Sequence, residues 1–346
     1  MTTPAPTRIV RFGTGTIADV AAVAAEAGIT RPVLVATRRG VRQASQIERV
    51  ATFDGVLPHA PIETIEAART IVREHAADGL IGLGGGSAVD TCKAVVAGLA
   101  EDGVDPVPRI LAIPTTYAGA EWTPFFGMLL GEGRKGGGLD HRATPVAAVY
   151  DPELSVELPL EATVGTAMNA LAHCAEAYYH PERGPRAERH ADTGATAIGH
   201  ALPLVAARPD GIYGRTRLLE GAMRAAFALA ESGLCLAHAM AQVLGGRYGQ
   251  PQGTMNALCL PGALRFNAEA VPEAVARFGK ALGSDDAAAR VAELAALGGF
   301  ARLRDYGVLE PELAEVASQV VARPGARANP RPASEADVEE LLRAIW

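Results

Sequence analysis

The stretch GLIGLGGGS, residues 79–87, decides how the first half of this chain is organised. It begins as a short apolar run typical of a buried strand and ends in consecutive glycines. The residues that follow, SAVDTCKAVVAGLA (87–100), have helical periodicity, with Ser87 as the expected helix cap. Glycines at a strand-to-helix turn let the backbone approach a phosphate, and the helix N-terminus offers free N–H groups to the anion. The loop therefore predicts a nucleotide site, with a plain connecting turn as the alternative.

Short apolar runs and helical patterns alternate on both sides of this loop. Strands are expected at RIVRF (8–12), PVLVAT (32–37), RILAIPTT (109–116) and PVAAVYDPEL (145–154), with helical patterns at 17–27 and 62–78. The glycine-rich segment 131–138 predicts a surface hairpin or loop. Strands that alternate with helices predict an α/β domain, with a mostly parallel, Rossmann-like sheet covered by helices on both faces. The loop itself is not a GxGxxG fingerprint and follows the third of the expected strands.

The pattern changes beyond residue 158. Ala- and Leu-rich segments with helical spacing run from about 160 to the end, with one short strand suggested near 255–260. The expected breaks between these helices lie at 180–187, 206–214, 245–254 and 323–334. A chain of 346 residues is too long for one ordinary core. We therefore expect an α/β dinucleotide-binding domain at 1–155 and an all-helical substrate domain at 156–346.

The composition excludes several classes of partner. The net charge of −7 argues against a nucleic-acid groove or an anionic membrane surface, and no run of 18 apolar residues predicts a membrane span. The start of the chain lacks the pattern of a secretory leader, and the scattered cysteines form no CxxC pair. These cysteines are Cys92, Cys174, Cys235 and Cys259. Reduced thiols in a cytoplasmic protein are the expected reading.

Four motifs, in order along the chain, resemble one enzyme superfamily. GGGSAVDTCK (84–93) is similar to the GGGSxxDxxK signature of the iron-containing alcohol dehydrogenases and dehydroquinate synthases, and IPTTYAGAEWTPFFG (113–127) is similar to their PTTxxxGSE segment. VGTAMNALAHCAEAYY (164–179) and LAHAMAQVLGGRYGQPQGTMNALCLP (236–261) resemble helical signatures of the maleylacetate reductase branch, as does Tyr-Ala-Gly in the second motif. The resemblance implies a dehydroquinate synthase-like fold and an NAD(P)H-dependent reductase, and it suggests a homodimer.

The same resemblance assigns a site for NADH or NADPH. The residues it implies for the pyrophosphate are Gly84, Gly85, Gly86 and Ser87, with Asp90 in the same site, and those for the nicotinamide are Thr115 and Thr116, with Tyr117 nearby.

Cofactor preference depends on the residues after the second expected strand. Thr37 stands where an acidic residue often binds the ribose 2′-hydroxyl of NAD, and Arg38 and Arg39 follow it. Without the carboxylate, and with two cations nearby, NADPH is expected to be tolerated or preferred. Two solvated loop charges are the alternative.

The sequence departs from the family's pattern at the metal site. Iron-dependent members hold a divalent metal with one Asp and three His, and the matching positions here carry Asn169, His173, His238 and Gln252. Two imidazoles and two amides make a poor closed site for Fe²⁺ or Zn²⁺, so we expect no catalytic metal. Asn169 also resembles the maleylacetate reductases, which the resemblance implies work without metal. Gln242, Gln252 and Asn256 stand where that branch has histidines, which leaves the substrate and the retention of redox activity open.

The resemblance implies the reduction of maleylacetate to 3-oxoadipate in aromatic catabolism. Without a metal, hydrogen-bond donors must stabilise the negative charge that develops on the substrate. The candidates are His238, His173, Tyr117 and Asn169. The substrate is expected to be a small anion, held by cations of the 131–142 loop or by backbone donors near Gly119. Two alternatives stay open: a biosynthetic reductase of another conjugated or carbonyl substrate, and a non-redox enzyme or nucleotide-binding scaffold on the same fold.

Overall fold

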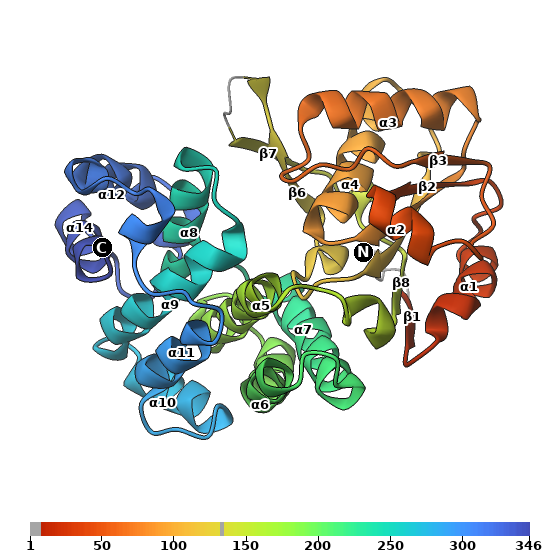
Figure 1. The fold of residues 1–346 in the computed structure, drawn as a ribbon. Coiled ribbons are helices and arrows are strands. Elements are labelled where there is room, and N and C mark those ends of the chain that lie inside the picture. Colours follow the sequence, from red (N-terminus) through yellow and green to blue (C-terminus); the bar gives the residue numbers. More distant parts are fainter. Residues whose placement is uncertain (1–7, 132–134) are drawn as a thin grey trace. The chain divides into compact units, whose positions relative to one another are not determined.

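The computed structural model describes residues 8–131 and 135–346, which form two compact units (Figure 1). The first unit contains the chain up to Thr116 and the segment Ala120–Ser155. The second contains Tyr117–Gly119 and Val156–Trp346, so the chain enters it briefly at residue 117 before returning. Within the described residues, no helix is both long and apolar enough to cross a bilayer.

The first unit is built on a six-stranded parallel sheet, which confirms the predicted α/β class. In spatial order, the strands are β1 (Ile9–Phe12), β8 (Ala147–Tyr150), β5 (Arg109–Pro114), β4 (Gly79–Gly84), β2 (Pro32–Ala36) and β3 (Ala51–Phe53). The sequence did not predict β3, because a three-residue strand is too short to show a period. The expected glycine-rich hairpin is the antiparallel pair β6 (Phe125–Leu129) and β7 (Lys135–Leu139), and residues 132–134 lie outside the described part.

Helices cover both faces of this sheet because strand side chains alternate between two cores. Val33 and Val35 of β2 pack with α3 (Ile62–Glu74) and α4 (Gly86–Glu101). Leu34, between them, packs on the opposite face with residues of α1 (Val20–Glu26) and with Val41 of α2 (Arg38–Gln43). The short 3₁₀ helix Thr16–Asp19 precedes α1, so the predicted helix at 17–27 begins with a tighter turn.

The regular elements of the second unit's described residues are all helices, joined by loops. Its helices are α5 (Leu160–Tyr179), α6 (Pro185–Ala207), α7 (Ile212–Ala230), α8 (Leu236–Arg247), α9 (Gln252–Ala268), α10 (Pro272–Ala281), α11 (Ala287–Ala296), α12 (Leu313–Val321), α13 (Pro324–Arg327) and α14 (Glu335–Ala344). Small residues let these helices approach closely, and a Cβ on Gly194 of α6 would lie 2.8 Å from the Sγ of Cys174. The strand suggested near 255–260 is wrong, because this segment lies inside α9. α9 is buried on nearly all sides, and its sequence therefore lacks the one-sided pattern of a surface helix.

Candidate active site

The glycine loop lies at the carboxyl edge of the parallel sheet. The chain runs from β4 to β5 in one direction and from β2 to β3 in the other, so its path diverges between β2 and β4. Open α/β sheets bind ligands at such a divergence, outside the carboxyl ends of the strands. Ala36 pairs with Leu83, and Gly84 pairs with Pro114. The glycine loop, Thr37 and Thr115 therefore leave the sheet at the same edge.

The glycines of the loop form a cradle that leaves no space for side chains of its own. A Cβ on Gly84, whose φ is +153°, would lie 2.9 Å from the Cβ of Ala88. A Cβ on Gly85 would lie 2.9 Å from the Cγ2 of Thr116. Helix α4 begins at Gly86, and its N-cap residue Gly85 makes no side-chain capping bond. The cradle fits the pyrophosphate of a dinucleotide, which the helix N-terminus would stabilise.

Ser87 does not cap α4, which corrects the expectation from its sequence. Its hydroxyl accepts a hydrogen bond from the backbone N–H of His59, at 3.0 Å. His59 and Ala60 both have positive φ, +62° and +45°, a strained conformation for residues with side chains. The loop at 59–60 therefore borders the glycine loop. The sequence gives no signal for it, because positive φ at a non-glycine residue follows from tertiary contacts.

Asp90 lies one turn into α4 and accepts the N–H of Gly127 at 3.2 Å. Burial raises the pKa of Asp90 to about 6, although the nearby Lys93 ammonium opposes the rise. Lys93 is fully buried, and its Nζ donates to the carbonyl of Phe125 at 2.9 Å and to the hydroxyl of Thr123 at 3.1 Å. A third bond reaches the carbonyl of Ala120, so Lys93 anchors this segment on α4.

The residues expected to read the ribose lie on the surface after β2. The hydroxyl of Thr37 caps α2 by accepting the N–H of Gly40 at 3.2 Å. The Arg38 side chain is 87% exposed, and its Nε lies 3.7 Å from the carboxylate of Asp54. Asp54 follows β3 and was not singled out from the sequence. The structure thus places an acid beside the cation expected to favour a 2′-phosphate.

In the second unit, α5 and α8 both pack against α9 (Figure 1). Together these three helices carry a buried polar cluster. Asn169, His173 and Glu176 share one face of α5, because spacings of four and three residues correspond to one helical turn. His238 lies in the first turn of α8, and Asn256 lies on α9. The cluster thus unites Asn169, His173 and His238, which the sequence singled out as catalytic, with Asn256 and with Glu176.

One backbone carbonyl fixes the direction of the hydrogen bonds around Asn169. The Nδ2 of Asn169 donates to the carbonyl of Ala118 at 3.0 Å, and a carbonyl only accepts, so this atom of the amide must be the nitrogen. The Oδ1 of Asn169 then accepts from the Nδ2 of Asn256 at 2.7 Å. The same Nδ2 of Asn169 lies 3.4 Å from the Nε2 of His173. A nitrogen that faces a donor acts as the acceptor, which places the proton of neutral His173 on Nδ1.

Glu176 determines which nitrogen of His238 carries the proton. Its carboxylate is fully buried and accepts the backbone N–H groups of Cys235, at 2.7 Å, and His238, at 3.1 Å. One of its oxygens also lies 2.7 Å from the Nδ1 of His238. A carboxylate that already accepts backbone donors makes Nδ1 the donor, so the Nε2 of His238 carries the free lone pair or the second proton.

The cluster has polar atoms that no protein group satisfies. Among the described residues, the buried atoms without a hydrogen-bond partner include His173 Nδ1, His238 Nε2, Asn256 Oδ1 and Gln252 Nε2. Burial and the neighbouring His238 lower the pKa of His173 well below its ordinary value. Buried polar atoms normally have partners, and atoms that lack them mark a place where a ligand supplies the bonds. The cluster therefore offers a neutral donor, an acid–base nitrogen and an acceptor.

Tyr117 has a different position from the one expected. Its side chain is fully buried, and its hydroxyl accepts from Arg215 at 3.3 Å. The Arg215 guanidinium, also fully buried, donates to the Oγ1 of Thr163 at 2.8 Å and to the carbonyl of Leu158 at 3.2 Å. These contacts give Tyr117 a supporting position, one residue before the carbonyl that orients Asn169, in place of the predicted donor role.

The remaining sequence candidates are Gln242, Gln252, the cations of the 131–142 loop and Gly119. Gln242 follows His238 by one turn on α8, and Gln252 begins α9. In the 131–142 loop, Arg142 forms an exposed ion pair with Asp140, at 2.7 Å, and Arg134 lies outside the described residues. Gly119 lies close to the cluster, since a Cβ there would be 3.6 Å from the Cε1 of His173.

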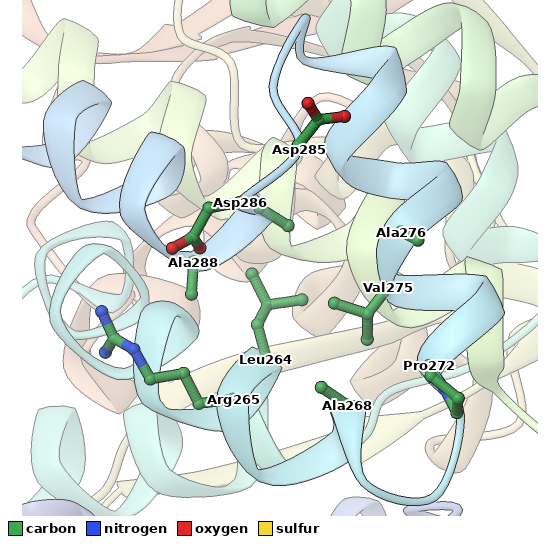
Figure 2. Close-up of a pocket in the computed structure, with 10 residues that line it drawn as sticks. Leu264, Arg265, Ala268, Pro272, Val275, Ala276, Asp285, Asp286 and Ala288 are labelled. Atoms are coloured by element: carbon green, nitrogen blue, oxygen red, sulfur yellow. The ribbon is translucent and has the colours of Figure 1, made fainter.

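A pocket of about 350 Å³ opens between α9, α10 and α11 (Figure 2). Its wall is mixed: Leu264 and Val275 are apolar, and Figure 2 shows the charged Asp285 and Arg265 around it. None of the sequence-predicted site residues is among its lining residues, which also include Ala268, Pro272, Ala276, Asp286, Ala287 and Ala288. This pocket is therefore lined by other residues than the histidine cluster.

Comparison with known proteins agrees with this division of the chain. Residues 6–152 match the iron-containing alcohol dehydrogenase family, and residues 163–346 match the C-terminal region of the same family. A maleylacetate reductase of Sphingobium indicum is 34% identical, over 99% of this chain and 96% of that protein. Maleylacetate reductase 1 of Rhodococcus opacus is 32% identical, over 99% and 94%. The crystal structure of a maleylacetate reductase from Agrobacterium tumefaciens superposes with a TM-score of 0.89 at 31% identity, covering 100% of this chain and 97% of that one.

These matches confirm the resemblance drawn from the four motifs and the dehydroquinate synthase-like architecture. The chain belongs to the iron-containing alcohol dehydrogenase family, in its maleylacetate reductase branch, and is an oxidoreductase that uses a nicotinamide dinucleotide.

Proposed function

We propose that the enzyme reduces maleylacetate to 3-oxoadipate with NADH or NADPH, and that it does so without a catalytic metal. One observation carries the proposal: two buried imidazoles lie side by side with His173 Nδ1 and His238 Nε2 unpartnered. Maleylacetate reductases of similar length and sequence support the choice of substrate. A homodimer in the cytoplasm belongs to the same proposal.

The first unit would hold the cofactor at the carboxyl edge of its sheet. Gly84, Gly85 and Gly86 would hold the pyrophosphate, and the N-terminus of α4 would supply donors to it. Thr115 and Thr116 follow β5 at the same edge, where we place the nicotinamide side. When bound, the reduced nicotinamide supplies the hydride.

The residues of the cluster do not fit the metal that the family name implies. The amide nitrogen of Asn169 faces both the Ala118 carbonyl and the Nε2 of His173, and an amide nitrogen is not a metal ligand. Gln252 supplies a second amide in place of an imidazole. Among the described residues, no three or more His, Cys, Asp or Glu side chains are placed to hold one ion. The donor chemistry of these positions supports a reaction that uses protein donors instead.

The cluster matches the charge that conjugate reduction creates. Hydride adds to the alkene carbon that is β to the ketone of maleylacetate, and the electron pair of the C=C bond moves to give an enolate oxygen. His173 stays neutral because of its low pKa, and its Nδ1–H donates to this oxygen. His238 in its imidazolium form delivers a proton from Nε2 to the α carbon, which restores the ketone. One hydride and one proton therefore convert the enone into the saturated keto acid.

A second candidate follows from Asn256. Its Oδ1 is a buried acceptor without a partner, and the keto dianion of maleylacetate brings no donor to it. A conjugated or carbonyl substrate with a hydroxyl group would satisfy this atom, as in a biosynthetic reductase of the same branch. Family membership favours either reductase over a condensation or elimination enzyme or a scaffold.

The decisive experiment offers maleylacetate to the purified enzyme with NADH and, separately, with NADPH. We expect nucleotide oxidation, 3-oxoadipate by mass spectrometry and rates unchanged by excess chelator, with less than one metal ion per chain. Failure to bind either nucleotide would contradict the reductase. Turnover that is lost to chelator and restored by Fe²⁺ would contradict the metal-free mechanism, and turnover confined to hydroxylated enones would favour the second candidate.

A further inference from the structure

Glu176 was not singled out by any motif, yet it makes more contacts in the cluster than a helix cap requires. The N-cap residue of α8, Cys235, makes no side-chain capping bond, and Glu176 supplies the acceptors from α5. Where an N-cap side chain does cap a helix in the described residues, it is local and at the surface, as Asp286 caps α11 through the N–H of Ala289. Capping α8 therefore does not by itself account for a carboxylate that is 0% exposed.

The additional contact is the bond to the imidazole. The Oε2 of Glu176 lies 2.7 Å from the Nδ1 of His238, while Nε2 on the other side of the same ring has no partner. A carboxylate in this position holds the proton on Nδ1, fixes the plane of the ring and balances its charge when Nε2 is protonated. A backbone carbonyl would fix the tautomer but would not balance the charge.

We propose that Glu176 is the positioning residue of this site, which keeps the proton of His238 on Nδ1 and thereby leaves Nε2 free for proton transfer. This role rests on the reductase function proposed above, because that function makes Nε2 the proton carrier. Glu176 acts through His238 and does not touch the substrate in this scheme.

The replacement Glu176→Gln keeps the size of the side chain and changes its charge and hydrogen bonding. It therefore tests the positioning role apart from packing. Both carboxylate oxygens accept N–H groups, so the amide must turn its NH₂ toward one of these donors. When the NH₂ replaces Oε2, it loses the bond from Cys235 and donates to Nδ1, so the proton of His238 moves to Nε2. When it replaces Oε1, it faces the N–H of His238, and the imidazole loses the charge that balances it. We expect kcat to fall by roughly tenfold or more, with the KM for nucleotide little changed. Glu176→Asp keeps the charge, and its kcat is expected to lie between those of the native enzyme and Glu176→Gln.

The tautomer itself is measured by nitrogen NMR of enzyme labelled with ¹⁵N-histidine, at alkaline pH, where imidazoles are neutral. The His238 signals are assigned by their loss in His238→Gln. The native enzyme is expected to show Nδ1–H at His238, and Glu176→Gln is expected to show Nε2–H or a mixture.

Asp286→Ala is the matched control, because it removes a helix cap in the same unit without touching a histidine. It is expected to lower Tm and to leave kcat and the His238 tautomer unchanged. Native His238 in the Nε2–H form would overturn the proposal, as would Glu176→Gln with the native tautomer and kcat. The native spectrum decides even if the variant does not fold. If the native enzyme reduces no maleylacetate, the proposed function fails, while the spectrum still reports what Glu176 does.

Discussion

His173 and His238 stack their imidazole rings almost face to face, with centroids 4.7 Å apart and planes inclined by 9°. Two cationic rings at this separation would repel each other in a buried site. The pair therefore carries one proton beyond neutrality at most, and His173, whose pKa burial and His238 lower, is the ring that stays neutral. A neutral donor beside a proton carrier is the division that an enone reduction requires.

Stability is expected to depend on pH through His173. Its pKa is lowered in the fold, so the unfolded chain binds more protons below the ordinary value of about 6.5. The contribution of His173 to the free energy of unfolding is fully present above about pH 6.5. It decreases as the pH falls toward the folded pKa, by up to about 1.4 kcal/mol per pH unit. In denaturant unfolding, the free energy of unfolding of the wild type is expected to fall more steeply with pH below about pH 6.5 than that of His173→Gln. Parallel curves would contradict the lowered pKa, since His180 and His190 contribute equally to both proteins.

Replacing His238 removes the proton carrier. We expect His238→Gln to lower kcat by at least about tenfold, because general acid catalysis typically contributes a hundredfold or more. Nucleotide affinity, measured by fluorescence titration, is expected to stay the same, because the glycine loop belongs to the other unit. The exposed His200, whose Nδ1 lies 2.8 Å from the carbonyl of Thr196, gives the control His200→Gln. Unchanged turnover in His238→Gln would remove His238 from the mechanism.

Asn169 separates this site from a metal site. In Asn169→Asp, an oxygen would face the Ala118 carbonyl in place of the donor now 3.0 Å away, at a cost of about 1–3 kcal/mol in stability. Combined with Gln252→His, it supplies the Asp and the third His of the iron-dependent pattern. Thermal unfolding of the double variant is expected to shift upward with Fe²⁺ or Zn²⁺, and that of wild type is not. Stoichiometric metal in the native protein would show that our account of Asn169 is wrong.

The glycine cradle predicts a loss of nucleotide binding in Gly85→Val. The new side chain begins 2.9 Å from the Cγ2 of Thr116 and occupies the space assigned to the pyrophosphate. We expect no NADH or NADPH binding by fluorescence or calorimetry. Gly103→Ala is the control, since a Cβ there meets nothing within 4 Å and only its φ of +83° is unfavourable. Binding of both nucleotides by Gly85→Val would place the pyrophosphate elsewhere.

Arg38 is expected to set the preference between the two nucleotides. Arg38→Ala would lose a charge-assisted contact with a 2′-phosphate, and we expect NADPH affinity to fall by roughly tenfold while NADH affinity changes little. Asp54→Asn frees Arg38 from its exposed acidic neighbour, 3.7 Å away, and is expected to favour NADPH slightly. Titrations at low and high salt measure both effects. Equal losses for NADH and NADPH would mean that Arg38 acts on a shared part of the cofactor.

The fold followed from the sequence because its decisive signals are local. The apolar run at 79–84 and the glycines after it give β4 and the turn into α4, and no distant contact is needed to recognise them. The Ser87 cap and the strand near 255–260 were wrong for the opposite reason. Tertiary contacts determine both features. The backbone N–H of His59 donates to the Ser87 hydroxyl, and the surrounding helices bury α9 on nearly all sides.

Only part of the candidate site could be predicted from the sequence. Asn169, His173 and His238 were found because they occupy motif positions, and the structure brings them together. Glu176 was missed although it lies one turn after His173, because its partner in α8 is 62 residues away. The Ala118 carbonyl was missed because a backbone group leaves no mark on the sequence. Residue identity therefore showed which rings are present, and only the contacts show which nitrogen of each ring carries the proton.

The buried cysteines allow the local opening of each unit to be measured separately by thiol labelling. Burial raises the pKa of Cys92 in the first unit and of Cys174 and Cys259 in the second, so their thiols react as thiolates only when the surrounding helices open. Alkylation followed by peptide mass spectrometry then times the opening of each unit in the same sample. A nucleotide that binds the glycine loop would slow labelling of Cys92, which lies on α4 five residues after Ser87. A ligand of the histidine cluster would slow labelling of Cys174, which is the next residue after His173.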